Sequence, residues 1–356
     1  MMASTTTAPY TRAVVAAMRK LYPEALADKT FDNTGLLLES PFNPERRQKN
    51  SVLLTIDLTT AVADEAIRRK ASIVVAYHPI IFRGLKSLSL RDPQQRSLLR
   101  LASAGISVYS PHTAVDCVKD GLNDWLADIV TGTPVEISTE DTGRMTYKLQ
   151  HHPSQTSRDA SALSLGASEH TRRPIQPTTI GGYPGAGIGR VVRFPSAVPL
   201  MQIIHRIVLG IGIPRGFPVA VPQGKTASDM RIRSVGICAG SGGHVFGEMD
   251  KAGEDVDLLF TGELGHHEAL AAIERGRCVI ALFHSNTERG FLHAVMKSEL
   301  EAEIRMQWES LRKADLESGH LSEELAHALQ DQDTEVHVSE VDRDPYGILT
   351  PNVDAS

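Results

Sequence analysis

Short apolar runs and amphipathic stretches alternate over the first 130 residues of the chain. The runs 51–58, 72–79 and 106–113 (SVLLTIDL, SIVVAYHP and ISVYSPHT) have the length and continuous apolar character of buried strands. The stretches predicted to be helices are 59–70, which opens with a threonine cap, 92–105, which ends at a glycine, and 121–130. This alternation predicts a mainly parallel sheet covered by helices.

After residue 130 the amino-acid composition and the predicted secondary structure change twice. Residues from 131 onward are polar and rich in Ser, Thr, Arg and Pro, and a strand–helix rhythm returns near residue 181. After residue 300 the sequence is charged and helical, and it then becomes acidic. We therefore predict an N-terminal α/β lobe at 10–130, a variable, partly disordered insertion at 131–180, a C-terminal α/β lobe at 181–300, and a helical, acidic tail at 301–356.

Composition narrows the class of protein. The 356 residues carry a net charge of -6 without a dominant basic face, which argues against a nucleic-acid partner. The three cysteines form no CxxC pair, so a disulfide framework and a thiolate zinc site are both excluded. No stretch approaches the ~20 apolar residues of a membrane helix. We expect a cytoplasmic protein, with mitochondria as the alternative because the first acidic residue is Glu24.

Ligand-type side chains follow three of the predicted strands. His78 ends the second run, His112 ends the third, and His284 ends the run CVIALF. Asp116 and Glu288 each follow a histidine by four residues, which places both side chains on one face if the intervening segment is helical. In open α/β sheets ligands bind outside the carboxyl ends of strands. The pattern predicts a site there, although a single strand-end histidine is more often a core or capping residue.

Imidazole and carboxylate together suit zinc, iron, manganese, cobalt or nickel. A carboxylate such as Glu288 can bridge two ions, so a centre with two divalent ions is plausible, and such centres activate water and polarise phosphoryl or carbonyl oxygens. The glycine-rich turn 240–243 (GSGG) lacks the Lys-Ser/Thr of a nucleotide loop, and 185–190 (GAGIGR) precedes a predicted strand instead of following one, which argues against dinucleotide binding. A tight turn is the better interpretation of GSGG.

The motifs of the chain resemble those of the NIF-three-like proteins, a dinuclear-metal family also labelled GTP cyclohydrolase 1 type 2. The matching stretches, in family order and nearly end to end, are FDNTGLLLESP (31–41), LLTIDLT (53–59), YHPIIFRGLKSL (77–88), VYSPHTAVDCVKDGLNDWLAD (108–128), GAGIGR (185–190), VGICAGSGG (235–243), DLLFTGELGHHEAL (257–270) and HSNTERGF (284–291). The resemblance implies an α/β fold of two intertwined lobes with mainly parallel sheets, a strand-end metal site, and a homohexamer.

The resemblance also implies which residues bind metal. His78, His284 and Glu288 would hold one ion, while Asp116, Glu288 and His112 would hold the other. The family's HHP motif falls on Tyr77-His78-Pro79, so the second ion lacks an imidazole; a phenol with a pKa near 10 is a poor substitute. Tyr77 matches the eukaryotic-type variant of the motif.

Two functions of different classes follow from these observations. The first is a metal-dependent hydrolase of a nucleotide-like or cyclic substrate, in which Glu263, His266 and Tyr77 are candidates for proton transfer or substrate contact. The cyclohydrolase label does not lead us to predict GTP as the substrate. The alternative is a metal-handling or transcription-related regulatory protein that binds a protein partner without turnover.

Overall fold

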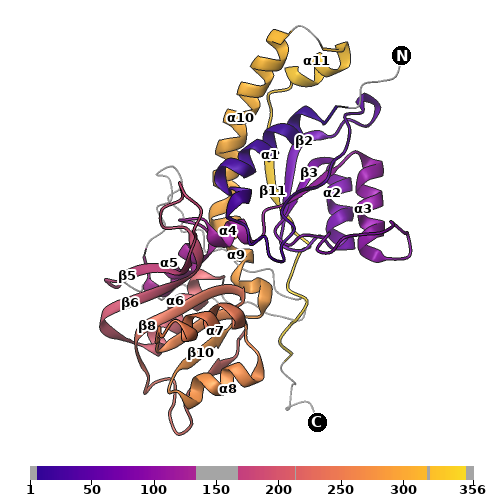
Figure 1. Ribbon diagram of the computed structural model, residues 1–356. Helices are drawn as coiled ribbons and strands as arrows, with labels where there is room; N and C mark the ends of the chain where they lie inside the picture. The colour runs from indigo at the N-terminus through magenta and orange to yellow at the C-terminus, as the bar shows by residue number, and fades with distance from the viewer. Residues whose placement is uncertain (1–5, 134–166, 213, 319–320, 350–356) are drawn as a thin grey trace. The chain divides into compact units, whose positions relative to one another are not determined.

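Two compact units make up the chain, and each combines two separate segments (Figure 1). Unit 1 comprises Met1–Val115 and Leu292–Asp342, and unit 2 comprises Asp116–Phe291 and Arg343–Ser356. The computed structural model describes residues 6–133, 167–212, 214–318 and 321–349. Both units contain a sheet and helices, which confirms the predicted α/β class.

The sheet of unit 1 has the strand order β1-β4-β3-β2-β11. Its strands are β1 (Gly35–Leu38), β2 (Lys49–Thr55), β3 (Ala71–Ala76), β4 (Ser107–Ser110) and β11 (Glu335–Val338). All neighbours are parallel except β1 and β4. The three apolar runs predicted as strands are β2, β3 and β4, and their carboxyl ends lie at one edge of the sheet.

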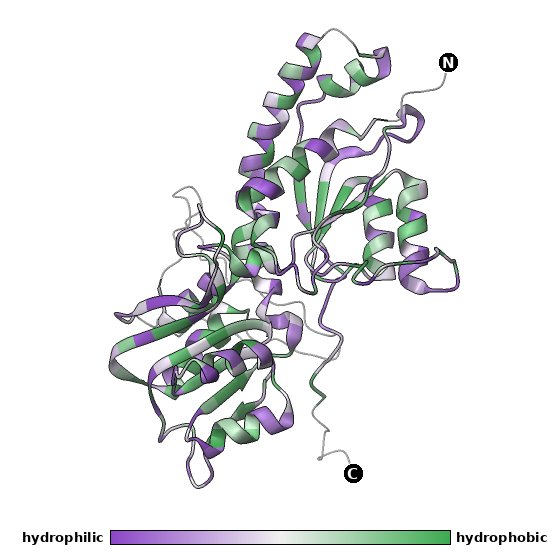
Figure 2. Cartoon of the chain, viewed as in Figure 1, coloured by the Kyte–Doolittle hydropathy of each residue, from purple (hydrophilic) through white to green (hydrophobic). Residues whose placement is uncertain are grey.

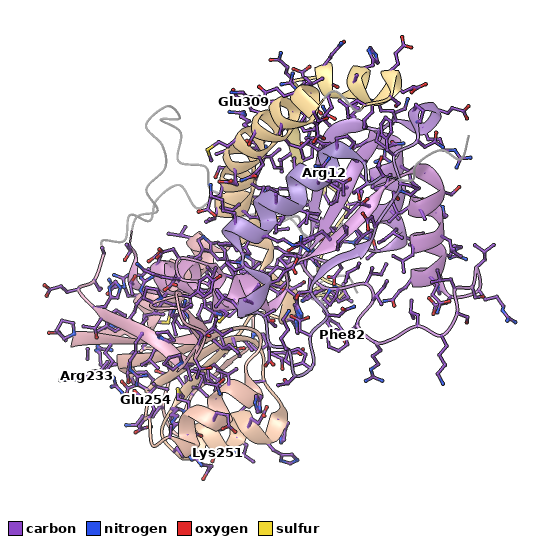
Figure 3. All side chains as sticks on the ribbon, turned by 45° about the horizontal axis from the view of Figure 1, so that its top comes forward. Arg12, Phe82, Arg233, Lys251, Glu254 and Glu309 are labelled. Carbon is purple, nitrogen blue, oxygen red and sulfur yellow. The ribbon has the colours of Figure 1, made fainter. Side chains whose placement is uncertain are left out.

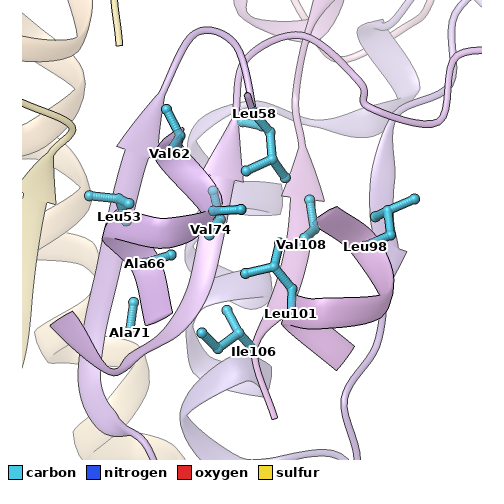
Figure 4. Close-up of a cluster of buried hydrophobic side chains, with 12 residues drawn as sticks. Leu53, Leu58, Val62, Ala66, Ala71, Val74, Leu98, Leu101, Ile106 and Val108 are labelled. Carbon is cyan, nitrogen blue, oxygen red and sulfur yellow. The ribbon is translucent and has the colours of Figure 1, made fainter. Parts of the chain in front are cut away.

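Helices on unit 1 bury the apolar side chains of this sheet. They are α1 (Pro9–Leu21), α2 (Thr60–Arg69), α3 (Pro93–Ala104), α10 (Lys297–Ser318) and α11 (Glu323–Gln330), with the short segments η1 (Glu24–Leu26), η2 (Pro44–Arg46) and η4 (Leu292–Met296). The Thr59 side chain accepts a hydrogen bond from the Val62 amide and caps α2, as expected. Figure 4 shows α2 and α3 packing on the strands through Leu53, Val74 and Leu101.

The second segment of unit 1 adds a strand that the sequence pattern did not predict. β11 lies parallel to β2, and the residues after it are anchored to α2. The buried Glu65 carboxylate accepts hydrogen bonds from the Ser339 hydroxyl (2.6 Å) and the Glu340 amide (3.2 Å), and it pairs with Arg69. Burial raises the pKa of Glu65, but these hydrogen bonds outweigh burial and bring the pKa below its ordinary value.

The sheet of unit 2 has the order β5-β6-β8-β9-β10-β7. Its strands are β5 (Thr171–Pro177), β6 (Gly187–Pro199), β7 (Val219–Ala220), β8 (Arg231–Ser241), β9 (Leu258–Glu263) and β10 (Cys278–Ala281). Only the pairs β8–β9 and β9–β10 are parallel. The expectation of mainly parallel sheets is therefore wrong for this unit, because β5 and β6 form a hairpin and β6 continues antiparallel to β8.

Unit 2 places helices on its sheet in the same way. They are α5 (Leu122–Thr131), α6 (Leu200–Gly210), α7 (Gly243–Lys251), α8 (His266–Glu274) and α9 (Arg289–Phe291), with η3 (His284–Thr287); α4 (Thr113–Cys117) spans the boundary between the two units. Phe246 and Met249 of α7 pack with Leu259 and Val279 of the strands. Figure 2 shows alternating polar and apolar residues along α7 and α8. No described helix has the length and apolar character needed to cross a bilayer.

Part of the predicted insertion is a strand. Residues 134–166 lie outside the described residues, but β5 covers Thr171–Pro177. The Arg172 guanidinium on β5 contacts the carboxylates of Asp124 and Asp128 on α5. β5 joins the sheet by antiparallel pairing with β6, and these ion pairs link it to α5.

The GAGIGR stretch forms the start of β6, and its glycines are required by close packing. Gly187 has φ +152°, and a Cβ there would lie 2.3 Å from the Gln176 carbonyl oxygen and 2.7 Å from Pro174. We therefore expect Gly187→Ala to lower the free energy of unfolding by about 1–3 kcal/mol, measured by urea denaturation. Gly181→Ala is the matched control because a Cβ there meets nothing within 4 Å. Equal effects of both substitutions would contradict this explanation.

Candidate functional site

His78 and His112 lie together at the carboxyl edge of the unit 1 sheet. His78 follows β3 by two residues and His112 follows β4 by two residues. Because β3 and β4 are parallel neighbours, the two rings approach each other, with centroids 5.4 Å apart. The strand-end pattern thus brings two predicted metal ligands together.

Each of these histidines contacts a carboxylate through Nδ1. The Nδ1 of His78 is 2.9 Å from an Asp57 oxygen, and Asp57 follows the neighbouring strand β2. The Nδ1 of His112 is 2.6 Å from an oxygen of the buried Asp32 side chain. A carboxylate can only accept, so Nδ1 carries the proton in both rings and Nε2 is the nitrogen suited to bind a metal.

Asp32 is held by several donors. The amide of Thr113 donates to Asp32 over 3.2 Å, and the Thr113 hydroxyl also donates to it. Burial raises the pKa of Asp32, but the hydrogen bonds from His112 and Thr113 outweigh burial, and the pKa lies below its ordinary value. Asp32 is therefore a charged residue that fixes the orientation of His112.

His284 and Glu288 form the corresponding group in unit 2. His284 follows β10 by three residues, and η3 brings Glu288 back toward it, with His284 Nε2 and Glu288 Oε1 3.6 Å apart. The Nδ1 of His284 is 3.0 Å from a Glu263 oxygen at the end of β9. Glu288 is only 2 % exposed. A buried carboxylate beside an imidazole is the arrangement expected of metal ligands.

Asp116 belongs to the same region of unit 2. Burial raises the pKa of the Cys238 thiol, and the charges of Asp116 and Glu288 raise it further, so both carboxylates approach the end of β8. The Asn123 side chain donates to the Asp116 carbonyl oxygen and accepts from the Ala239 amide, each over 3.0 Å. These bonds connect Asp116 to the strand beside Glu288. The raised pKa keeps Cys238 a neutral thiol.

Strained backbone occurs at one predicted ligand and immediately before another. Four non-glycine residues have positive φ in the described part of the chain, and His112 (φ 36°) and Phe283 (φ 66°) are two of them. Phe283 immediately precedes His284. Such conformations cost about 1–3 kcal/mol each and are concentrated at functional sites.

The GSGG turn approaches this group closely. Gly240 has φ +61°, and a Cβ there would lie 3.0 Å from both Glu288 Oε1 and His284 Nε2. The Gly240 amide donates to the Thr287 hydroxyl over 2.9 Å. The turn therefore serves close packing around the candidate ligands, in agreement with the tight-turn interpretation.

The remaining candidates differ in their surroundings. Tyr77 is buried, and its ring centroid lies 5.3 Å from that of His78 and 5.8 Å from that of His112, edge-on to each. His266 is exposed on the first turn of α8, where its ring contacts that of His267. Glu263 is exposed and contacts the Nδ1 of His284. The catalytic roles of Tyr77, His266 and Glu263 stay predictions.

The sequence did not single out Asp32 and Asp57 as contacts of the histidines. Both residues occur in stretches that match the family, FDNTGLLLESP and LLTIDLT, and this match was the only available signal. In unit 1 the imidazoles of His78 and His112 are held by carboxylates, and in unit 2 His284 is held by one and lies beside Glu288. Each group consists of nitrogen and oxygen donors, which suit a divalent transition metal.

Comparisons with known proteins agree with the motifs. Residues 9–313 match the family model Duf34/NIF3 (NGG1p interacting factor 3). The Protein NIF3 homolog of Schizosaccharomyces pombe is 43% identical over 291 residues, covering 82% of this chain and 88% of the relative. The NGG1-interacting factor 3 of Saccharomyces cerevisiae is 35% identical over 297 residues, covering 82% and 90%.

Solved structures share the fold. A hypothetical protein of Staphylococcus aureus superposes with a TM-score of 0.63 at 17% identity, covering 97% of this chain and 100% of that one. A Bacillus cereus protein related to NIF3 has a TM-score of 0.61 at 17% identity, covering 98% and 100%. With the family model spanning most of its length, the chain belongs to the Duf34/NIF3 family.

Proposed function

We propose that this protein binds two divalent transition-metal ions and uses them in hydrolysis. As the family resemblance implies, His78, His284 and Glu288 would hold one ion, and two histidines with a carboxylate are typical of catalytic sites that keep a position open for water. His112, Asp116 and the shared Glu288 would hold the second ion. His112 and Asp116 are one helical turn apart along the chain, on α4 and the residue before it.

The observation that carries this proposal is the set of three imidazole–carboxylate pairs. His78, His112 and His284 each have Nδ1 at 2.6–3.0 Å from a carboxylate oxygen. Metal-binding histidines nearly always donate their second ring N–H to a carboxylate, a backbone carbonyl or water, and a carboxylate fixes the ring and raises the basicity of the other nitrogen. Histidines that serve only in the core are not expected to make the same Nδ1–carboxylate contact at three strand ends.

A bound ion would supply Lewis acidity, polarising a phosphoryl or carbonyl oxygen and lowering the pKa of water. The residues of the chain would orient the ligands and transfer protons. Glu263 is half exposed while it contacts His284, so it is placed both to hold that ring and to exchange a proton with solvent. We infer a substrate with a hydrolysable phosphoester or cyclic amide, in line with the nucleotide-like or cyclic class that the sequence suggests.

The alternative function rests on the name of a relative. The Saccharomyces cerevisiae protein is described as an NGG1-interacting factor, which favours a regulatory protein partner for this chain as well. A metal-handling or regulatory role predicts metal binding without turnover in a broad hydrolase screen. The homohexamer and the cytoplasmic or mitochondrial location stay predictions.

Metal stoichiometry tests the proposal. Inductively coupled plasma mass spectrometry of the full chain, purified under controlled metal supply, is expected to find about two ions per wild-type chain. His284→Ala combined with Glu288→Ala is expected to remove both, because Glu288 is shared. The matched control combines His337→Ala with Glu335→Ala, which removes an exposed His–Glu pair at 3.1 Å on β11.

The measured metal content distinguishes a two-ion centre from a metal-handling role. Loss of metal only in the first double variant, with the far-ultraviolet circular dichroism spectrum preserved, supports the site. One ion per wild-type chain would mean that the second site, where Tyr77 replaces an imidazole, stays unfilled and would favour metal handling. An absence of metal in the wild type would overturn the proposal.

A further inference from the structure

Two exposed phenylalanines lie beside His112. Phe31 is 52 % exposed and Phe82 is 45 % exposed, although large aromatic side chains are normally well buried. Their ring centroids are 6.1 Å apart with an interplanar angle of 47°, and each lies 6.4 Å from the His112 ring, edge-on. Figure 3 shows the labelled Phe82 at the surface of unit 1. The two rings therefore expose apolar faces directly next to a candidate metal ligand.

Hydrogen bonds hold the two loops that carry these rings. Phe31 precedes Asp32, which holds the imidazole, and the Asn33 side chain donates to the carbonyl oxygen of Ile81, which precedes Phe82. The first loop is thus bonded to the histidine through Asp32, and the second loop is bonded to the first through Asn33. Such preorganisation lowers the entropy that a ligand must overcome on binding.

The loop that carries Phe82 is also cationic. Residues 80–91 (IIFRGLKSLSLR) contain Arg83, Lys86 and Arg91 and no acidic residue. Arg83 and Lys86 are exposed. Aromatic faces with adjacent basic side chains are the combination that binds a planar ring bearing an anionic group.

We propose that Phe31 and Phe82 form an aromatic platform that stacks the planar heterocyclic ring of the substrate, with Arg83 and Lys86 contacting its anionic substituent. This inference rests on the proposed function, because it takes the ring to be part of the molecule on which the metal centre acts. It assigns substrate selection to two loops of unit 1. Stacking tolerates different heterocycles because each of them has a π-face.

Fluorescent 1,N6-ethenoadenosine monophosphate is the probe for the platform. Titration of the full-length protein is expected to change the emission of the probe saturably, and ribose 5-phosphate, which has the phosphate but no planar ring, is expected to compete poorly. Phe82→Ala is expected to weaken binding about 5- to 150-fold, the range for loss of one stacking aromatic. Phe82→Trp, which keeps a π-face, is expected to retain binding, whereas Phe82→Leu is not. Arg83→Gln is expected to weaken binding of the probe more than that of ethenoadenosine.

Leu88→Ala is the control within the same loop, because Leu88 is 52 % exposed but aliphatic. An equal loss in Leu88→Ala, or a change in oligomeric mass in the Phe82 variants, would overturn the platform and indicate contact between copies of the chain. Absence of saturable binding, or binding insensitive to Phe82, also overturns it. Metal content measured on the same samples separates the two proposals. If the protein contains metal but does not bind the probe, only the platform is refuted. If protein purified without metal binds the probe in a Phe82-dependent manner, only the metal centre is refuted.

Discussion

An Arg190→Met variant is expected to lose about 3–5 kcal/mol of unfolding free energy, the cost of removing one member of a buried ion pair and leaving the Asp124 carboxylate with only the more distant Arg172 guanidinium. Arg190 on β6 is 1 % exposed, and its Nη2 and Nε donate to both oxygens of Asp124 over 2.6 and 2.9 Å. Its Nη1 donates to the carbonyl oxygens of Gly187 and Gly189. The guanidinium thereby ties α5 to the sheet of unit 2.

Acid should reduce the difference between this variant and the wild type. Burial raises the pKa of Asp124, but the hydrogen bonds and charge of Arg190 outweigh burial, so the pKa lies below its ordinary value. A depressed carboxyl pKa contributes stability above the unfolded value, near 3.9, and this stability is lost as the pH falls through the folded value. Urea unfolding at neutral pH and at about pH 3 measures both effects.

Arg193→Met provides the matched control for Arg190→Met. Arg193 is on the same strand and pairs with Glu254, but its side chain is 49 % exposed. An exposed ion pair contributes about 0–1 kcal/mol. Similar losses in the two variants would show that the burial of Arg190 does not determine its contribution.

Three strands of unit 1 were predictable because their signals are local, whereas β1 and β11 were not predicted. Continuous apolar runs predicted β2, β3 and β4, and the Thr59 cap predicted the start of α2. β11 was missed because EVHV occurs in an acidic segment, and its place beside β2 depends on contacts with residues almost 300 positions earlier. The antiparallel hairpin of β5 and β6 was missed because ion pairs to α5, and not apolar periodicity, hold β5.

The candidate site was predictable to the extent that it follows strand ends. The histidines stand at those ends, and the four-residue spacing places Glu288 beside His284. The carboxylates that hold the rings were not predictable from spacing, since Asp32 and His112 are 80 residues apart and Asp57 and His78 are 21 apart. Pairing over such separations is set by the adjacency of loops in the folded sheet, which local patterns do not contain.

An Asp32→Asn variant is expected to weaken metal binding about 10- to 100-fold, the usual effect of losing a carboxylate behind a ligand histidine. Asparagine keeps the shape of Asp32 but removes its charge, and its amide can face Nδ1 with either a donor or an acceptor. The His112 ring would then lose its fixed proton position and part of its basicity. Competition with a chromophoric chelator, titrated with zinc or manganese, measures the affinity.

Comparing the metal affinities of the Asp32→Asn and Asp57→Asn variants makes this prediction specific. Asp57→Asn should weaken the ion held by His78, while Asp32→Asn should weaken the ion held by His112, so the two variants should reduce different steps of a two-ion titration. Asp28→Asn is the control, since Asp28 lies in the same loop as Asp32 but accepts hydrogen bonds from Thr30. Unchanged affinity in both test variants would show that the carboxylates serve only the fold. The three imidazole–carboxylate pairs would then no longer support a metal centre.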